Sequence, residues 1–180
     1  MRVDSGPFGG LPGPAGHPDI LPHLDAAYDL ARWLTGNDAD AADVVQESCV
    51  RALRFASGYR GGNAKAWLLA IVRNTAMTWL ERRRASAVAT APEQLEQVAP
   101  AVERIDDADE LAHGIDQALL QRGIAALAPE FRAVLVLREF SDLSYQDIST
   151  VAGIPIGTVM SRLARARMHL RAFLVAEREK

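Results

Sequence analysis

The hydrophobic residues of this chain recur at helical spacing in two blocks, and a stretch without periodicity separates the blocks. In the first block, apolar residues spaced by three and four positions predict helices over about 19–35, 38–56 and 64–84. A Gly-Asn pair ends the first of these helices. The acidic residues that follow suit the start of the second, because the positive end of the helix dipole favours them there. The first block therefore predicts a small helical domain over residues 18–84.

Each predicted helix of this block has one apolar face that we expect to be buried. In the second helix this face consists of Val44, Val45, Ser48, Cys49, Ala52 and Leu53. In the third helix it consists of Trp67, Leu68, Ile71, Val72, Thr75 and Trp79. Cys49 is the single cysteine, which excludes an intramolecular disulfide, and its place on the apolar face favours a small buried residue.

The second block ends in two helices joined by a tight turn, after two helices predicted over about 115–127 and 129–140. Ser144 is a good N-cap for the third helix of this block, and Asp147, three positions further on, makes an imperfect capping box with it. Gly153 suits a left-handed residue after that helix, and Pro155 suits the first turn of the last one. These signals predict a helix-turn-helix within a domain over residues 115–175.

The last helix carries the positive charge that nucleic-acid binding requires. Between Ile156 and Phe173 there are four arginines and one histidine but no acidic residue. The second helix of a helix-turn-helix enters the major groove, where arginine bonds guanine and further arginines neutralise phosphates. The alternative is an ordinary helical hairpin with a solvated basic face. The cap, the turn and the uninterrupted positive charge together favour DNA. The inner face of this helix is predicted to be Ile156, Val159, Leu163 and Ala166.

The remaining segments lack a helical pattern. Residues 1–17 are rich in glycine and proline and are expected to form a disordered arm. Residues 85–114 contain prolines and many acidic residues and are expected to form a flexible linker, long enough to let two domains touch separate sites on one DNA molecule. The predicted fold class is all-α, with two small helical domains joined by a flexible acidic linker, the C-terminal one a helix-turn-helix.

Composition and motifs exclude several classes of protein. The net charge is −3, so a nucleic-acid surface has to come from an uneven distribution of charge. No apolar run is long enough for a signal peptide or a membrane span, which predicts a cytoplasmic protein without membrane insertion. The four histidines, at positions 17, 23, 113 and 169, are scattered, and no metal-ligand spacing, nucleophile elbow or phosphate loop occurs. We therefore expect no catalysis, no cofactor and no metal site.

Both blocks resemble one known family. The run APEFRAVLVLREFSDLSYQDIS followed by GIPIGTVMSRLARAR resembles the C-terminal domain of bacterial RNA polymerase sigma factors, specifically the extracytoplasmic-function (ECF) group of the sigma-70 family. DADAADVVQESCVRAL and YRGGNAKAWLLAIVRNTAMTWLERRR resemble the N-terminal conserved domain of the same group. One position departs from the commonest motif, because Met160 stands where many members have lysine and so lacks one phosphate or base contact of the family.

The resemblance implies a role for several sets of residues. It places a polymerase-binding face, which docks on the clamp helices of the β′ subunit, at Asp43, Gln46, Glu47 and Arg51. It places a loop that captures a flipped base of the minus-ten element at Ser57, Tyr59, Arg60, Gly61, Gly62 and Asn63. It places further minus-ten contacts at Lys65, Trp67, Arg73 and Asn74, although Trp67 also suits a core position. It places contacts to the minus-thirty-five element at Thr158, Ser161, Arg162, Arg165 and Arg167.

The resemblance also implies partners. They are core RNA polymerase, including a β flap contact on part of the apolar surface of the helix over 129–140, promoter DNA, and an anti-sigma factor that holds the protein inactive. In the family the acidic linker threads the RNA exit region of the polymerase, and a plain acidic tether is the alternative for this segment. The alternative function is a stand-alone helix-turn-helix regulator. That function predicts tight operator binding as a dimer without polymerase, and it leaves the acidic helix and the glycine loop without a role.

Overall fold

The secondary structure of the part of the chain that the structure describes is entirely helical. The structure, a computed structural model, describes residues 18–90 and 117–178. Two short 3-10 turns accompany the α-helices, Leu21–His23 (η1) and Ala56–Gly58 (η2). The α-helices are α1 (Leu24–Thr35), α2 (Asp38–Phe55), α3 (Ala64–Thr90), α4 (Gln117–Ala126), α5 (Pro129–Glu139), α6 (Tyr145–Ala152) and α7 (Ile156–Arg178). The all-α prediction is confirmed.

Helices α1, α2 and α3 pack together as the N-terminal half (residues 18–90). The tight corner between α1 and α2 follows from two residues. Gly36 ends α1 in the left-handed conformation at φ 89°, and Asn37 begins α2 by accepting a hydrogen bond from the Asp40 amide at 2.9 Å. Helix α3 continues past the predicted end at Arg84 to Thr90, so the first residues of the predicted linker are helical. The predicted arm and the remainder of that linker lie outside the described residues.

The inner face of α2 differs in part from the predicted one. Its buried residues are Ala41, Val44, Ser48 and Ala52. Leu53 is 73% exposed, so its predicted burial is wrong. The reason is helical geometry, because Leu53 follows Ala52 directly and therefore points about 100° away from the buried line. Cys49 is half-buried, and burial raises the pKa of its thiol.

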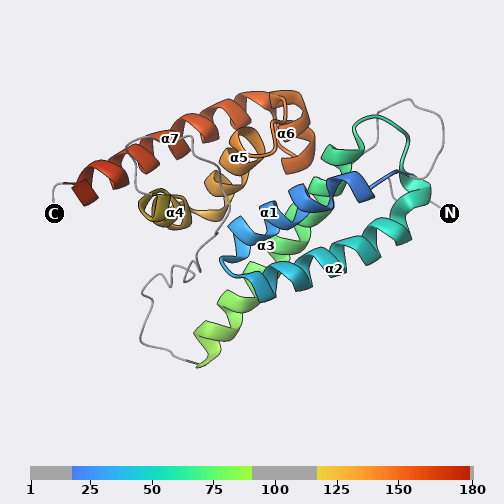
Figure 1. Cartoon of the computed structure of the whole chain (residues 1–180), viewed down its shortest axis with the longest axis horizontal. Coiled ribbons are helices and arrows are strands. Elements are labelled where there is room, and N and C mark those ends of the chain that lie inside the picture. The colour runs from blue at the N-terminus through green and yellow to red at the C-terminus, as the bar shows by residue number, and fades with distance from the viewer. Residues whose placement is uncertain (1–17, 91–116, 179–180) are drawn as a thin grey trace.

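Helices α4 to α7 form the C-terminal half (residues 117–178), in which α5 is the central element (Figure 1). Residues 132–137 of α5 are all buried, between α7, α6 and helix α1 of the other half. Gly123 lets α4 approach α7 closely, because a Cβ atom at this position would lie 2.7 Å from Leu170 Cδ1. The long helix α7 packs against all three other helices of this half, α4, α5 and α6.

The two halves lie directly against each other, which the sequence pattern does not predict. In Figure 1, α5 lies beside α1, and α6 lies at the beginning of α3. Buried residues of both halves belong to one continuous hydrophobic cluster, with Leu30 and Leu34 on one side and Val134 and Leu137 on the other. The ring of Trp33 in α1 packs against Phe140 at the end of α5, with ring centroids 5.1 Å apart.

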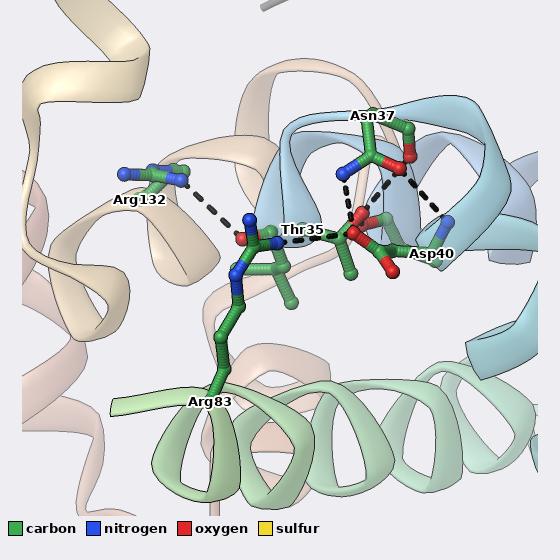
Figure 2. A network of polar contacts seen from close by, with 7 residues as sticks. Thr35, Asn37, Asp40, Arg83 and Arg132 are labelled. Atoms are coloured by element: carbon green, nitrogen blue, oxygen red, sulfur yellow. Dashed lines mark hydrogen bonds and ion pairs between the residues drawn. The ribbon is translucent and has the colours of Figure 1, made fainter. Parts of the chain in front are cut away.

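A buried arginine occupies the junction of the halves. Arg132 of α5 is only 4% exposed, and its Nη1 donates to the carbonyls of Trp33 at 3.1 Å and Leu34 at 3.4 Å, at the end of α1. Its Nη2 donates to Ala125 and Leu127, around the end of α4. Figure 2 shows the guanidinium beside the corner that follows α1. Burial lowers the pKa of Arg132 to about 10, with a smaller effect from Arg84, so this group remains charged at neutral pH.

The corrected inner faces predict a contrast between two leucines of the N-terminal half. Leu68 of α3 is fully buried, so Leu68→Ala should lower the free energy of unfolding by about 2–5 kcal/mol. Leu53→Ala removes an exposed side chain and should change it by less than about 0.5 kcal/mol. Urea denaturation followed by circular dichroism measures both values. Equal losses for the two variants would show that Leu53 is a core residue after all.

Candidate nucleic-acid interface

The predicted helix-turn-helix is confirmed as the pair α6 and α7. The Ser144 hydroxyl accepts a hydrogen bond from the Asp147 amide at 3.1 Å, which caps α6. The Asp147 carboxylate contacts that same hydroxyl at 2.6 Å, and this explains why the box is imperfect. Gly153 ends α6 in the left-handed conformation at φ 65°. The amide of the next residue, Ile154, donates a hydrogen bond to the Ser149 carbonyl at 3.1 Å. These short-range bonds fix the angle at which α7 leaves the turn.

Helix α7 presents most of its predicted DNA-binding residues to solvent. Val159, Leu163 and Ala166 form the buried face as predicted, whereas Ile156 is 38% exposed. Ser161 and Arg165 are exposed, and Thr158 and Arg162 are half-buried. Arg167 is exposed too, and it donates to Glu139 at the end of α5 at 2.6 Å, which raises the pKa of Arg167. The outer face of α7 is therefore cationic, with one arginine also paired to a neighbouring helix.

The glycine loop before α3 is held in a defined conformation. Gly61 and Gly62 have φ values of 86° and 94°, which residues with a side chain rarely adopt. The Tyr59 hydroxyl donates to the Gly62 carbonyl at 2.7 Å, so the aromatic ring closes the loop on itself. The Asn63 side chain accepts from the Ala66 amide at 3.0 Å and so caps α3. Ser57 and Arg60 are exposed beside this frame.

Trp67 supports this loop from the core. It is 7% exposed, and its ring meets the Tyr59 ring edge-on with centroids 5.5 Å apart. Its indole is therefore not placed to stack on a base, and the core position that the sequence allowed is the one it occupies. Its contribution to the loop is to orient Tyr59.

Two of the predicted minus-ten residues, Asn63 before α3 and Lys65 in its first turn, contact the other half of the molecule. Lys65 Nζ donates to the Ser141 carbonyl at 2.7 Å, and Asn63 Nδ2 donates to the Asp147 carboxylate at 3.3 Å. Arg73 donates to Asn74 at 3.0 Å. Arg73 is half-buried, and its pKa is lowered first by burial and then by the charge of Arg162 in α7. Arg73 of α3 and Arg162 of α7 are therefore close enough for their charges to repel.

The outer face of α2 combines charge with exposed apolar surface. The predicted residues Asp43, Gln46 and Glu47 are exposed. Glu47 accepts from Arg51, one turn further on, at 2.7 Å, and this bond lowers the pKa of Glu47. Beside them lie three exposed apolar residues that the sequence analysis did not assign to any binding face. They are Val50, Leu53 and Phe55, with 47%, 73% and 58% of their surface exposed. For Val50 and Leu53 the available signal was their position off the buried line of α2, whereas Phe55 lies three residues after Ala52, on that line, and is exposed at the end of the helix.

The predicted β flap surface on α5 is mostly covered in this conformation. Val134, Leu135, Val136 and Leu137 are all buried, whereas Phe140 is 45% exposed. Within residues 18–90 and 117–178, no helix is long and apolar enough to cross a membrane. The same residues contain no cluster of three or more His, Cys, Asp or Glu side chains suited to a metal ion.

Comparison with known proteins gives one family for both halves. Residues 20–86 match the model of sigma-70 region 2, and residues 117–170 match that of sigma-70 region 4. The chain is 37% identical over 158 residues, 86% of its length, to the ECF RNA polymerase sigma factor SigE of Mycolicibacterium smegmatis, and the match spans 60% of that relative. It is 34% identical over 134 residues to the ECF RNA polymerase sigma-E factor of Salmonella typhimurium, covering 71% of this chain and 70% of the relative.

Two solved structures share the fold. The sigma factor RpoE of Bartonella quintana, in complex with the anti-sigma factor NepR, matches with a TM-score of 0.69 and 27% identity, over 87% of this chain and 94% of that one. CnrH, in complex with the cytosolic domain of CnrY, matches with a TM-score of 0.62 and 23% identity, over 87% of this chain and 85% of that one. The second likeness concerns the fold alone.

The turn of the helix-turn-helix generates a test with two glycines. Gly153→Ala should lower the free energy of unfolding by about 1–2 kcal/mol, because a Cβ atom is disfavoured at φ 65° even though space is open there. Gly157→Ala, in the first turn of α7, also meets no atom within 4 Å and has ordinary helical backbone. It should leave stability unchanged or raise it by up to about 1 kcal/mol. Thermal unfolding of both variants tests this, and a tolerant Gly153→Ala would argue against the observed turn.

Proposed function

This chain belongs to the ECF group of the sigma-70 family of bacterial RNA polymerase sigma factors, and we propose that it binds core RNA polymerase in the cytoplasm and directs it to promoters. The observation that carries this proposal is that regions 2 and 4 of the family both match, in the family order. Three features of the structure support the proposal: the helix-turn-helix with its cationic α7, the glycine loop before α3 and the exposed polar and apolar surface of α2. Binding polymerase and directing it to promoters requires no catalytic group.

For the minus-thirty-five element we propose recognition by α7 in the major groove. Ser161 and Arg165 lie exposed on the same helix, with Thr158 one turn before Ser161 and two turns before Arg165. Hydroxyl groups and arginine forks suit base edges, and Arg162 and Arg167 suit phosphates. Met160, which is 54% exposed on the same helix, supplies only an apolar contact in place of the lysine common in the family.

For the minus-ten element we propose capture of an unpaired base by the loop over residues 57–63. The pinned ring of Tyr59 and the exposed Arg60 offer stacking and phosphate contacts, and Lys65, Arg73 and Asn74 continue this surface along α3. Removing a base from the stack costs a few kcal/mol, and stacking returns about 1–3 kcal/mol per base. Trapping one or two bases therefore tips a local opening that the polymerase extends.

For the polymerase we propose the outer face of α2, in the role of the family's contact with the β′ clamp helices. The exposed apolar side chains Val50, Leu53 and Phe55 extend the polar set of Asp43, Gln46, Glu47 and Arg51. Binding energy at such interfaces concentrates in a few apolar or aromatic anchors surrounded by polar residues. Val50 and Leu53, one turn apart and beside the Glu47–Arg51 ion pair, fit that arrangement.

We also propose control by an anti-sigma factor. The Bartonella quintana relative of known structure is described in complex with such a factor, and its fold covers most of this chain. The exposed apolar surface of α2 suits a protein partner that competes with polymerase.

The minus-thirty-five assignment predicts the effect of one arginine. Arg165→Ala should weaken binding of the reconstituted holoenzyme to promoter duplex by about tenfold or more, because a bidentate base contact is worth about 1–3 kcal/mol. If Arg165 contacts a phosphate instead, the slope of log affinity against log salt should fall by about 0.9. Arg122→Ala, an exposed arginine of α4 paired with Glu177, serves as the matched control. Fluorescence anisotropy across a salt series measures both the affinity and its salt slope. Identical binding curves for Arg165→Ala and Arg122→Ala would contradict the assignment of Arg165 to the DNA-binding face of α7.

The polymerase assignment predicts the effect of one leucine. Leu53→Ala should weaken binding to core RNA polymerase by about tenfold, because a buried apolar anchor at an interface contributes more than 1 kcal/mol. Val175→Ala, a similarly exposed apolar residue near the end of α7, should leave that affinity unchanged. Biolayer interferometry with immobilised core enzyme gives the dissociation constants. Wild-type affinity for the Leu53 variant would remove α2 from the proposed interface.

A further inference from the structure

Met160 is an exposed apolar residue of α7, and we propose that it reads the methyl group of one thymine in the minus-thirty-five element. The inference rests on the proposed function of α7 and deepens it, because it assigns a base to one side chain. As a specificity-determining residue, Met160 adds little to the binding of DNA in general. It discriminates between promoter sequences at one base pair.

The position of Met160 is the first argument. It lies in the second turn of α7, within the part of a recognition helix that reaches base edges. Val159, Leu163 and Ala166 form the buried face of this helix, and Met160 lies off that face with 54% of its surface exposed. More than half of a large apolar side chain is therefore open to a ligand at the place where α7 would meet the bases.

The neighbours of Met160 are the second argument. Gly157 lies one turn before it and Ala164 one turn after it, and both are exposed. A Cβ atom added at Gly157 would meet no atom within 4 Å, so the space in front of the helix is open there. Small residues allow a backbone to approach a ligand closely. On this side of α7 the longest side chain of the three, that of Met160, is therefore the one that reaches furthest toward a base.

The chemistry of the major groove leaves one match for this side chain. Base edges there present hydrogen-bond donors and acceptors, and the C5-methyl group of thymine is the only apolar group among them. The thioether of methionine is a weak acceptor and not a donor, so it cannot replace the water bound to a polar edge. Contact with a thymine methyl group instead removes two apolar surfaces from water. Met160 therefore favours thymine over the other bases.

The next residue along the helix points to the same base pair. The Ser161 hydroxyl donates to the Thr158 carbonyl at 3.0 Å within α7, so toward a base it offers only an acceptor. An acceptor suits the amino group of adenine or cytosine. A thymine–adenine pair presents both a methyl group and an amino group in the major groove, whereas a guanine–cytosine pair has no methyl group. Met160 and Ser161 together match what a thymine–adenine pair presents.

Removing the methyl group from the DNA tests this contact without changing a hydrogen-bonding group. Deoxyuridine, which lacks only the C5-methyl group, replaces each thymine of the minus-thirty-five element in turn, on both strands of a promoter that the holoenzyme transcribes. Fluorescence anisotropy gives the affinity of holoenzyme reconstituted with the full-length chain. At one position the wild type should lose about fourfold in affinity, because burying one such carbon group is worth about 0.8 kcal/mol.

Three variants of α7 connect the lost affinity to Met160. Met160→Ala should bind the thymine and deoxyuridine duplexes equally at that position. Met160→Leu, which keeps a branched apolar side chain, should retain the preference for thymine. Met168→Ala is the matched control, because Met168 is 58% exposed and lies about two turns further along the same helix. It should show the wild-type loss with deoxyuridine.

Two kinds of result would overturn the inference. One is a preference for thymine that persists in Met160→Ala. The other is a wild-type holoenzyme that is insensitive to deoxyuridine at every position, or a minus-thirty-five element without thymine. These results leave the proposed function intact, because that function fails on a different measurement, an Arg165→Ala variant with unchanged affinity in the same assay.

Discussion

A single buried guanidinium, that of Arg132, donates hydrogen bonds to both halves of this molecule. Two helices, one from each half of the chain, end at the same place, and their last carbonyls need hydrogen-bond donors. Arg132 supplies those donors from α5 at 4% exposure and without a carboxylate in the bonds that it makes. Burying a charge is costly unless it is fully hydrogen-bonded, and the Arg132 Nε atom has no partner among the described residues. Separating the ends of α1 and α4 would also break its bonds to Trp33 and Leu34 and so add to this cost. The relative position of both proposed DNA-binding helices depends on this junction.

The distribution of charge connects that junction to function. The chain as a whole is slightly acidic, at a net charge of −3, yet Arg73 of α3 and Arg162 of α7, both proposed to contact DNA, are close enough for their charges to repel. The acidic and apolar surface of α2 lies on the outside of the N-terminal half. The surface proposed for polymerase therefore lies away from this junction, whereas Asn63 and Lys65, which are proposed to contact the minus-ten element, bond residues of the C-terminal half.

Local signals in the sequence predicted the helices and the turns between them. The contact between the two halves, which depends on residues far apart in the sequence, was not predicted. Ser144, Gly153 and Pro155 act on their own neighbours, so the helix-turn-helix was predictable from spacing alone. The burial of Leu53 was predicted wrongly because the apolar residues of α2 cover a wider part of the helix surface than the residues that are buried. Arg132 donates to the Trp33 carbonyl 99 residues away in the sequence, and the Trp33 ring packs on the even more distant Phe140, so no local pattern indicates these partners. The family assignment, which rested on longer motifs in both blocks, was confirmed by the matches to regions 2 and 4.

Run-off transcription tests the central claim most directly. Purified bacterial core polymerase, with and without the full-length chain, would be given a pool of promoter fragments from the genome that encodes it. The account predicts start sites that depend on the chain and share two spaced elements, one read by α7 and one by the loop before α3. Absence of stimulation, combined with tight and specific DNA binding by the chain alone, would contradict it and identify a stand-alone regulator.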